Sequence, residues 1–550
     1  MRRAAAWLAA LTMGAWATAW AHEPLVAYEV RAGDTLYGVS QRYLESRDDW
    51  RLLQRLNGVR DPRRLPPGLR LKLPLDRLRG VAQTATVLYA LGGVEVAEGH
   101  GSRPAQPGDR LAEGARVRVA PGGFAGLGLS DGSTLHLQGN TQLRLLRLRE
   151  AGELGVRDQR IGIERGRVDS TVKPLAPGSR FDVRTPRAVT GVRGTRFGVA
   201  LGADGLSMST DVIEGQVALL AEGPAAQPLA LAAGTGAVLP AASPSARAVP
   251  LLPPPAPEAA LAPVERFPHA LRLLPLPGAT GYRVQVSDTS APARVLSDQT
   301  VAEPLALLPA LPDGEHLLHL RAVDGGGLMG HERTLPLSVR ATPVPPLLRS
   351  PRAGEVLPLG QVRWLCTEVP GVQAYLLQVS PDPAFGREVQ EQRQEGRCDF
   401  QLPIEAQGEY HWRVASLQAT PGAPARRGPF SDAGSVTLLP RPSAPTGLQN
   451  DADGRRLFWR GQAGERYRVQ LSAAPDFASL LQDIEVALPE IRLDLQVCRT
   501  YFVRLSARSA QGLWSDFSAP RRVGLPGGLC SAEGNAVGGP GGEGWDTLAR

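Results

Sequence analysis

A Gly-Leu-Ser-Asp-Gly run at 128–132 has the spacing of a hydrolase nucleophile, G-x-S-x-G. In that motif, a serine on a strand-to-helix turn attacks a carbonyl group. Here a second strand-like run, Thr134–Leu137, follows at once, so Ser130 is expected in a hairpin turn. No H-E-x-x-H pattern, His/Cys cluster or Gly-rich phosphate loop accompanies it. The sequence therefore predicts no catalytic residues and a protein that is not an enzyme.

The sequence also lacks a set of histidine and cysteine side chains that is suited to bind a metal ion. The eight histidines are scattered along the chain. His316 and His319 lie three apart in a predicted strand, so their side chains point to opposite faces and cannot share a metal. Surface or edge positions explain both. The four cysteines are dispersed and lack the close pairs of a zinc site. We therefore expect no metal site and no cofactor.

Disulfide formation is the chemistry that the cysteines favour. Four cysteines allow three pairings. Pairing within a module is favoured, because each pair then falls in one sequence repeat or at its edge, and each bond would stabilise its module by roughly 2–4 kcal/mol. The favoured pairs are Cys366 with Cys398, and Cys498 with Cys530.

The N-terminal stretch from Tyr28 to Pro74 predicts a small domain of strand, helix, helix and strand. A strand at 27–30 is followed by a helix at Leu36, Val39 and Tyr43, which share one helix face. Asp34 or Thr35 is the expected N-cap. Asp48 or Asp49 should cap a second helix, and Asn57-Gly58 should end it. A strand at 69–73 completes the domain.

This domain, at 25–76, resembles the LysM family through Tyr-x-Val-x-x-Gly-Asp-Thr-Leu, Leu-Asn and Leu-x-Pro-Gly-x-x-Leu-x-Leu-Pro. The resemblance implies binding of N-acetylglucosamine glycans, chiefly peptidoglycan, in a groove between the loop after the first strand and the loop before the last. Asp34, Thr35 and Asn57 could instead serve only as caps and turn residues, and a single module implies weak binding. The implied glycan-binding residues are Gly33, Asp34, Thr35, Leu36, Tyr37, Asn57, Gly58, Leu65, Pro66 and Pro67.

Residues 81–239 alternate apolar and polar positions, with turn residues every eight to twelve residues or so, which predicts an all-β domain. It resembles the FecR-type periplasmic domain through Leu127–Leu135, Glu164–Val168 and, above all, Phe181–Phe197. In the signalling members of that family, the domain follows a cytoplasmic segment and one membrane helix. Neither is found in this sequence, which disfavours a role in regulating transcription.

A proline-rich linker is expected at 240–263, followed by three repeats at 264–341, 343–440 and 441–526. The tyrosines of three similar runs, Tyr282, Tyr375 and Tyr467, mark the repeat. With Trp364 and Trp459 at matching positions, the repeats resemble fibronectin type III modules, which are β-sandwiches. The first repeat lacks the tryptophan. The Gly-rich tail at 527–550 is expected to be disordered.

The first 21 residues read as a signal peptide, with Arg2 and Arg3, an apolar run and Ala19-Trp20-Ala21 at the cleavage point. A membrane anchor is the alternative, but the run is short for one. The mature chain is therefore expected in the periplasm or cell envelope, without a transmembrane segment.

A net charge of +7, with no basic run interleaved with aromatic residues, argues against nucleic-acid binding.

These observations predict a multidomain, mainly β protein: a small βααβ LysM module, an all-β FecR-type domain and three fibronectin type III-like sandwiches. The predicted function is a non-enzymatic scaffold that binds peptidoglycan glycan strands and presents its β-domains to a protein partner of the envelope. One alternative is a periplasmic sensor or regulator acting through the FecR-type domain. Another is an accessory subunit of a cell-wall hydrolase.

Overall fold

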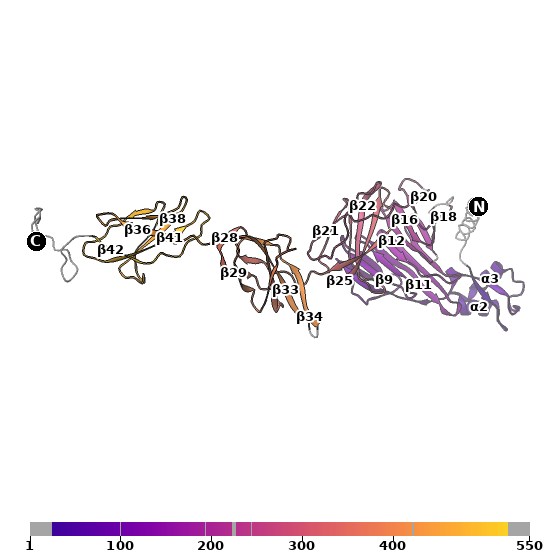
Figure 1. Cartoon of the computed structure of the whole chain (residues 1–550). Coiled ribbons are helices and arrows are strands. Elements are labelled where there is room, and N and C mark those ends of the chain that lie inside the picture. The colour runs from indigo at the N-terminus through magenta and orange to yellow at the C-terminus, as the bar shows by residue number, and fades with distance from the viewer. Residues whose placement is uncertain are drawn as a thin grey trace, which may run out of the picture. The chain divides into compact units, whose positions relative to one another are not determined.

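The computed structural model describes residues 25–99, 101–192, 194–222, 227–243, 245–420 and 423–525. The chain divides into two compact units, Met1–Arg340 and Ala341–Arg550, and Figure 1 labels their elements. The predicted fold class is confirmed, because most of the structure is β-strand and the helices are confined to a small N-terminal module. The predicted signal peptide at 1–21 and the tail at 527–550 lie outside the described residues.

The N-terminal module, drawn in indigo in Figure 1, has the predicted order of strand, helix, helix and strand. Its two strands pair antiparallel, and the apolar faces of its helices pack against them. The elements are β1 (Leu25–Glu29), α2 (Leu36–Tyr43), the 3-10 turn η1 (Arg47–Asp49), α3 (Trp50–Asn57), β2 (Arg70–Pro74) and the 3-10 turn η2 (Leu75–Arg77).

Local capping explains where these helices begin and end. Thr35 is the N-cap of α2, and its Oγ1 accepts a hydrogen bond from the Gly38 amide at 3.0 Å. Gly58 ends α3 with a φ of 62°, a left-handed conformation that glycine adopts without cost. The predicted carboxylate cap of the second helix is wrong: Asp49 precedes α3 but makes no capping bond. Ser46, one turn earlier, caps η1 instead.

The strands from 81 to 250 hydrogen-bond into one closed barrel. Its longest strand, β12 (Val156–Thr171), pairs along its first part with β11 and β13 and along its second part with β10 and β15. Part of the predicted linker belongs to this barrel, because Arg247–Pro250 forms strand β20, paired with β19. The other strands are β3 (Val81–Ala82), β4 (Ala85–Leu91), β5 (Val94–Glu98), β6 (Gly101–Pro104), β7 (Arg110–Leu111), β8 (Arg116–Val119), β9 (Phe124–Gly128), β10 (Thr134–Leu137), β11 (Gln142–Ala151), β13 (Arg180–Arg184), β14 (Ala188–Val192), β15 (Arg196–Leu201), β16 (Met208–Glu214), β17 (Gln216–Ala221), β18 (Leu229–Ala232) and β19 (Thr235–Leu239); the 3-10 turn η3 is Gly152–Leu154.

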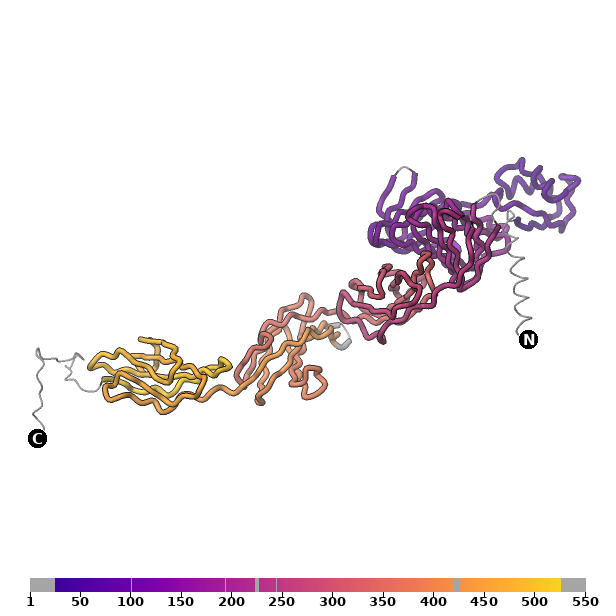
Figure 2. Tube along the Cα trace, turned by 90° about the horizontal axis from the view of Figure 1, so that it is seen from above, coloured from indigo at the N-terminus to yellow at the C-terminus, as the bar shows by residue number. Residues whose placement is uncertain are grey.

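Three β-sandwiches follow, the first in the unit Met1–Arg340 and the other two in the unit Ala341–Arg550. Each sets a small sheet against a larger one, and Figure 2 traces the later two in orange and yellow. The first contains β21 (His269–Arg272), β22 (Ala279–Ser287), β23 (Val295–Val301), β24 (Leu305–Leu308), β25 (Gly314–Asp324) and β26 (Arg333–Val339). The second contains β27 (Leu348–Ser350), β28 (Glu355–Pro358), β29 (Gly360–Cys366), β30 (Ala374–Ser380), β31 (Gln390–Glu395), β32 (Asp399–Ile404), β33 (Gly408–Thr420), β34 (Ala423–Phe430) and β35 (Gly434–Leu439). The third contains β36 (Thr446–Asn450), β37 (Arg456–Arg460), β38 (Arg466–Ser472), β39 (Leu480–Val486), β40 (Glu490–Arg492), β41 (Tyr501–Arg508) and β42 (Arg521–Val523).

The repeated tyrosines make the same contact in all three sandwiches. Tyr282, Tyr375 and Tyr467 lie on equivalent strands and are buried. Each hydroxyl accepts a hydrogen bond from a backbone amide a few residues upstream, at 2.8, 2.8 and 3.0 Å respectively. A buried ring with a satisfied hydroxyl stabilises the core and holds the preceding turn in place.

One predicted disulfide lies within the described residues. Cys366 on β29 is bonded to Cys398, which precedes β32. The bond joins two neighbouring segments of the second sandwich, as predicted. Cys530 lies outside the described residues, so its pairing with Cys498 remains a prediction.

Candidate functional site

Two loops of the N-terminal module lie side by side, as the predicted groove requires. The loop after β1 contacts the loop before β2 through backbone hydrogen bonds. The Leu36 amide donates to the Pro62 carbonyl at 2.9 Å, and the Gly68 amide donates to the Val30 carbonyl at 2.8 Å. Because these bonds are backbone to backbone, the pairing of the loops does not depend on side chains.

The predicted glycan-binding residues divide by exposure. Leu36 and Leu65 are buried in the core of the module, at 0% and 7% exposure. Tyr37, on the first turn of α2, is 45% exposed. The remaining exposed residues of the predicted set are Gly33, Gly58, Pro66 and Pro67. The surface that a glycan could contact therefore consists of backbone, two prolines and one aromatic ring.

The polar side chains of the predicted set are already engaged within the protein. Asp34 accepts hydrogen bonds from the Tyr28 hydroxyl at 2.6 Å and the Arg31 amide at 2.7 Å. Burial and this carboxylate raise the pKa of Tyr28. The Asn57 amide group bridges to the backbone of Lys72, accepting at 2.6 Å and donating at 3.0 Å. Thr35 caps α2, so all three polar side chains have a structural role.

The module also packs firmly on the barrel. Val156 of β12 belongs to the same buried cluster as the core of the module. Asp76 accepts hydrogen bonds from Arg180, at 2.8 Å, and from Arg160. Burial would raise the pKa of Asp76, but these two arginines outweigh burial and lower it. The module and the barrel therefore share a core.

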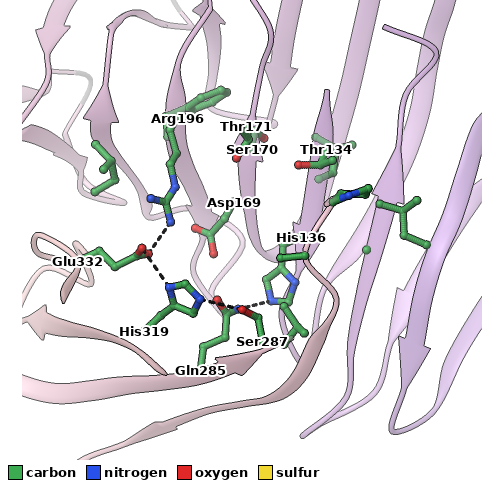
Figure 3. Close-up of a pocket in the computed structure, with 18 of the residues that line it drawn as sticks. Thr134, His136, Asp169, Ser170, Thr171, Arg196, Gln285, Ser287, His319 and Glu332 are labelled. Atoms are coloured by element: carbon green, nitrogen blue, oxygen red, sulfur yellow. Dashed lines mark hydrogen bonds and ion pairs between the residues drawn. The ribbon is translucent and has the colours of Figure 1, made fainter. Parts of the chain in front are cut away.

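A second candidate site lies where the barrel meets the first sandwich. On the barrel, Thr134, Thr171 and Arg196 stand opposite one another across β10, β12 and β15. On the sandwich, Gln285 and His319 stand opposite each other across β22 and β25. These two sheets face each other across a cavity of about 520 Å³ (Figure 3). Its size is within the range usual for small-molecule sites.

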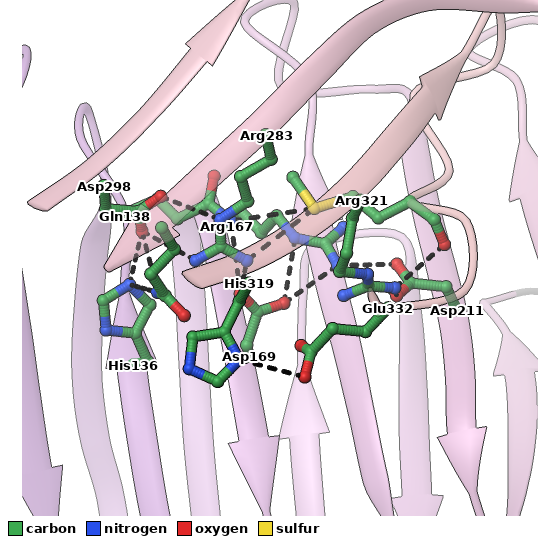
Figure 4. Close-up of polar contacts among 12 residues, drawn as sticks. His136, Gln138, Arg167, Asp169, Asp211, Arg283, Asp298, His319, Arg321 and Glu332 are labelled. Carbon is green, nitrogen blue, oxygen red and sulfur yellow. Dashed lines mark hydrogen bonds and ion pairs between the residues drawn. The ribbon is translucent and has the colours of Figure 1, made fainter. Parts of the chain in front are cut away.

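A layer of paired charges lies beside this cavity (Figure 4). Arg283 of the sandwich forms a two-pronged ion pair with Asp298, at 2.9 and 2.7 Å, and also donates to Asp169 of the barrel. We call this set the charged layer. Its members are Arg167, Asp169, Asp211, Arg283, Asp298 and Arg321.

The charged layer joins the two domains at its other end as well. Asp211 of the barrel is fully buried and accepts hydrogen bonds from Arg167, at 2.7 Å, and from Arg321 of the sandwich, at 2.5 Å. The layer holds three arginines and three aspartates, so its formal charges cancel. Buried charges are tolerated when each has an opposite partner, and here the partners come from both domains.

The electrostatics around Asp298 and Arg283 favour the charged forms of both side chains. Burial alone would raise the pKa of Asp298, but Arg283 and His136 outweigh it, and the pKa lies well below its usual range. Burial likewise disfavours the charged form of Arg283, yet Asp169 and Asp298 raise its pKa. The pair of Arg283 and Asp298 is therefore ionised at neutral pH.

Two histidines border the cavity. The His136 ring lies 2.6 Å from Asp298 through Nε2 and 2.8 Å from the Tyr89 hydroxyl through Nδ1. His319 contacts Ser287 at 2.9 Å and Glu332 at 3.3 Å. The expectation of surface or edge positions is wrong for both histidines of β25, because His316 is 6% exposed and the barrel covers the sheet that carries His319.

Close packing in the charged layer requires a glycine on β15. A Cβ atom at Gly198 would overlap Arg167 Nη2 and lie 2.7 Å from Asp169 Oδ1. Gly198→Ala is therefore expected to lower the free energy of unfolding by about 1–3 kcal/mol, the usual cost of overpacking. The measurement is urea unfolding of the full chain. Gly101→Ala is the control, because nothing lies within 4 Å of a Cβ there; equal effects of the two changes would contradict the prediction.

No local pattern of residues indicates this second site. Its polar residues are scattered between Thr134 and Glu332, and only the pairing of two sheets brings them together. One compositional feature could have drawn attention to it. Only two of the 61 basic residues are lysines, Lys72 and Lys173, and Lys173 lines the cavity.

The serine of the G-x-S-x-G run lies in a hairpin. Ser130 follows β9, which pairs antiparallel with β10, so the strand-to-helix turn of a hydrolase nucleophile is not formed. Within the described ranges, no group of three or more His, Cys, Asp or Glu side chains could hold a metal ion. Of the helices in these ranges, none is long and apolar enough to cross a membrane.

Comparison with protein families identifies two segments. Residues 28–74 match the LysM domain, which covers both loops of the N-terminal module. Residues 115–218 match the FecR protein family, within the barrel. These two domains are of binding or regulatory kinds, and no enzyme family appears among the matches. A comparison with curated proteins found no match.

Solved structures with similar parts include a protein proposed to be an anti-sigma factor from Parabacteroides distasonis, at 21% identity and a TM-score of 0.21. The match covers 24% of this chain and 59% of that one. The first three fibronectin domains of chicken CNTN1 match at 15% identity and a TM-score of 0.25, covering 50% and 100% of the two chains. The fibronectin(III)-like modules of CbhA from Clostridium thermocellum match at 13% identity and a TM-score of 0.23, covering 33% and 93%. With TM-scores this low, these similarities do not bear on function.

Proposed function

We propose that this protein is a non-enzymatic scaffold of the periplasm or cell envelope that holds on to peptidoglycan glycan strands through its LysM module. The FecR-type barrel and the fibronectin-like sandwiches then present surfaces to a protein partner in the envelope. The observation that carries the proposal is the match of residues 28–74 to the LysM domain over both loops of the predicted groove.

The geometry of the loops supports the proposal. Their backbone bonds hold the two walls together, and Tyr37 offers an exposed ring beside them. An aromatic ring and exposed backbone groups are the usual means of contacting a sugar face and its acetamido group. Glycan contact would thus depend on loop shape and Tyr37, rather than on the engaged side chains of Asp34, Thr35 and Asn57.

The test is sedimentation of the full chain with purified insoluble peptidoglycan. The full chain is needed because the LysM core includes Val156 of the barrel. Tyr37→Ala is expected to reduce the bound fraction several-fold, since loss of a contact worth about 1 kcal/mol changes affinity about fivefold. Leu25→Ala is the matched control, since Leu25 is 38% exposed on β1, outside the two loops.

Tyr37 is a better probe than Gly33 or Thr35. A side chain at Gly33 would strain a backbone with φ of 88°, and loss of Thr35 would remove the cap of α2. With either change, a smaller bound fraction could reflect unfolding of the module rather than loss of a glycan contact. If the wild-type chain fails to sediment, or if Tyr37→Ala and Leu25→Ala bind equally, the proposed tether is wrong.

A regulatory role is the second candidate, because residues 115–218 match the FecR protein family. In that case the barrel would report a condition of the envelope to a partner that crosses the membrane. Cross-linking in the native bacterium separates the candidates: a membrane-bound regulator trapped through the barrel favours regulation, and recovery with peptidoglycan alone favours the scaffold.

A further inference from the structure

The cavity between the barrel and the first sandwich presents a row of hydrogen-bond donors (Figure 3). Thr134, Thr171 and Arg196 stand opposite one another on three neighbouring strands of the barrel. Lys173, two residues after the end of β12, also lines the cavity. Four donor groups, two of them cationic, therefore line the cavity, and two of them, Thr171 and Lys173, are exposed.

Lys173 is held in place by its backbone. Its amide donates to Ser133 Oγ at 3.1 Å, and Ser133 in turn donates to Asp131 at 3.0 Å. Among the described residues, however, the Lys173 ammonium group forms no ion pair, and the Thr134 and Thr171 hydroxyls have no hydrogen-bond partner. The Lys173 ammonium group and the two threonine hydroxyls are thus unused within the described parts of the chain, whereas Arg196 already pairs with Glu332.

Most hydrogen-bond acceptors that border the cavity already bind a donor group of the protein. Glu332 accepts from Arg196 at 2.5 Å and contacts His319 at 3.3 Å. Asp169 belongs to the charged layer, where Arg167 and Arg283 neutralise it. Glu214 is exposed, opposite Arg196 on the next strand. The groups left to meet a ligand are therefore mainly donors, which suits an acceptor-rich ligand.

We propose that this cavity binds a small ligand that carries an oxyanion, either a carboxylate or a phosphate group. The oxyanion accepts hydrogen bonds from the Thr134 and Thr171 hydroxyls and pairs with the Lys173 ammonium group. Charge-assisted bonds of this kind are stronger than those between neutral groups. The rest of the ligand contacts the apolar wall formed by Leu88, Pro292, Ala293 and Val295. This site is separate from the LysM loops and does not rest on the proposed function.

Lysine acetylation tests the site directly, because the chain has only two lysines. The full chain is treated briefly with an acetylating reagent, and the modification at Lys173 and Lys72 is measured by mass spectrometry. Lys72 is exposed on β2 and serves as the control within the same molecule. The probes are N-acetylmuramic acid, inorganic phosphate and, as an uncharged comparison, N-acetylglucosamine.

The expected result is slower acetylation of Lys173, but not of Lys72, with N-acetylmuramic acid or with phosphate. Protection by only one of the two identifies carboxylate or phosphate as the preferred group. N-acetylglucosamine should leave Lys173 unprotected even if it binds the LysM module, so the result is independent of the tether. If neither anion slows acetylation of Lys173, or if the neutral sugar protects it equally, the proposal is overturned.

Titration calorimetry of variants gives a second measurement. Lys173→Met should weaken binding of the protective anion about tenfold, the loss expected for one charge-assisted bond. Lys72→Met should leave it unchanged. Thr171→Val, which keeps the shape of the side chain and removes its hydroxyl, should weaken binding by a smaller factor. Unchanged affinity in both Lys173→Met and Thr171→Val would exclude the site.

Discussion

Asp298→Ala is expected to lower the free energy of unfolding of the Met1–Arg340 unit by about 3–5 kcal/mol, the usual cost of removing one partner of a buried ion pair. Asp298 and Arg283 are each 5% exposed, and two hydrogen bonds join them. Removing the Asp298 carboxylate leaves the buried guanidinium of Arg283 with a single carboxylate partner, Asp169. It also removes the contact of 2.6 Å to His136 of the barrel. Urea unfolding of the full chain measures the loss.

The third sandwich offers a matched control at the equivalent position. Asp298 stands opposite Gln285 on its sheet, and Asp483 stands opposite Gln470 in the same way. Arg468 holds Asp483 with the same two-pronged geometry, at 2.7 and 2.6 Å, but its side chain is 43% exposed. Because solvent screens that pair, Asp483→Ala should cost less than about 1 kcal/mol. The two changes remove the same two-pronged pair, and they differ in its burial and in the contact of Asp298 to His136 of the barrel.

Acid should reduce the difference between wild type and Asp298→Ala. The pKa of Asp298 is lowered in the folded state, so its contribution to stability is present above the unfolded pKa of about 3.9. That contribution is lost as the pH falls from there through the folded pKa. The two proteins should therefore differ most near neutral pH and progressively less below about pH 4. Equal costs for Asp298→Ala and Asp483→Ala near neutral pH would show that the charged layer does not hold the barrel and sandwich together.

The charged layer also shows where sequence reasoning reached its limit. Alternation along each strand predicts which residues share a face, but not which two faces meet. Asp169 and Arg283 are 114 residues apart, and their contact depends on how the first sandwich packs on the barrel. Nothing in the local pattern distinguishes Arg283, which is buried, from Arg468, which occupies the same place in an exposed sheet. The cavity and its donors were missed for the same reason.

Most features set by local sequence were predicted, although the carboxylate cap of the second helix was not. The loop glycines, the Thr35 cap and the repeated tyrosines all act through contacts within a few residues, so a single stretch of sequence contains the information. The candidate groove was predicted in this way, because both of its loops lie within one small module. Burial within that module was harder to foresee: Leu36 and Leu65 lie in the core, while Tyr37, next to Leu36, is exposed.

Trp364→Ala is expected to destabilise the second sandwich by about 3–5 kcal/mol, the range for replacing a fully buried aromatic side chain with alanine. Trp364 on β29 is 0% exposed, and its ring centroid lies 5.2 Å from that of Trp412. The change removes both the buried area and the paired arrangement of the rings, which adds to the effect of burial. The Cys366–Cys398 bond next to it keeps β29 close to β32, so the cavity cannot readily collapse. Calorimetry of the full chain measures the shift in the unfolding of this sandwich.

Trp364→Phe separates the loss of volume from the loss of the indole. The Trp364 N–H has no hydrogen-bond partner among the described residues, so phenylalanine gives up no hydrogen bond and retains an aromatic ring opposite Trp412. It should therefore cost clearly less than alanine, because the remaining cavity is smaller. Trp459→Ala in the third sandwich, at 5% exposure, should have an effect close to that of Trp364→Ala. A cost below about 1 kcal/mol for Trp364→Ala would mean that the two rings are not the centre of this core, and that the disulfide and the buried tyrosine suffice to hold it.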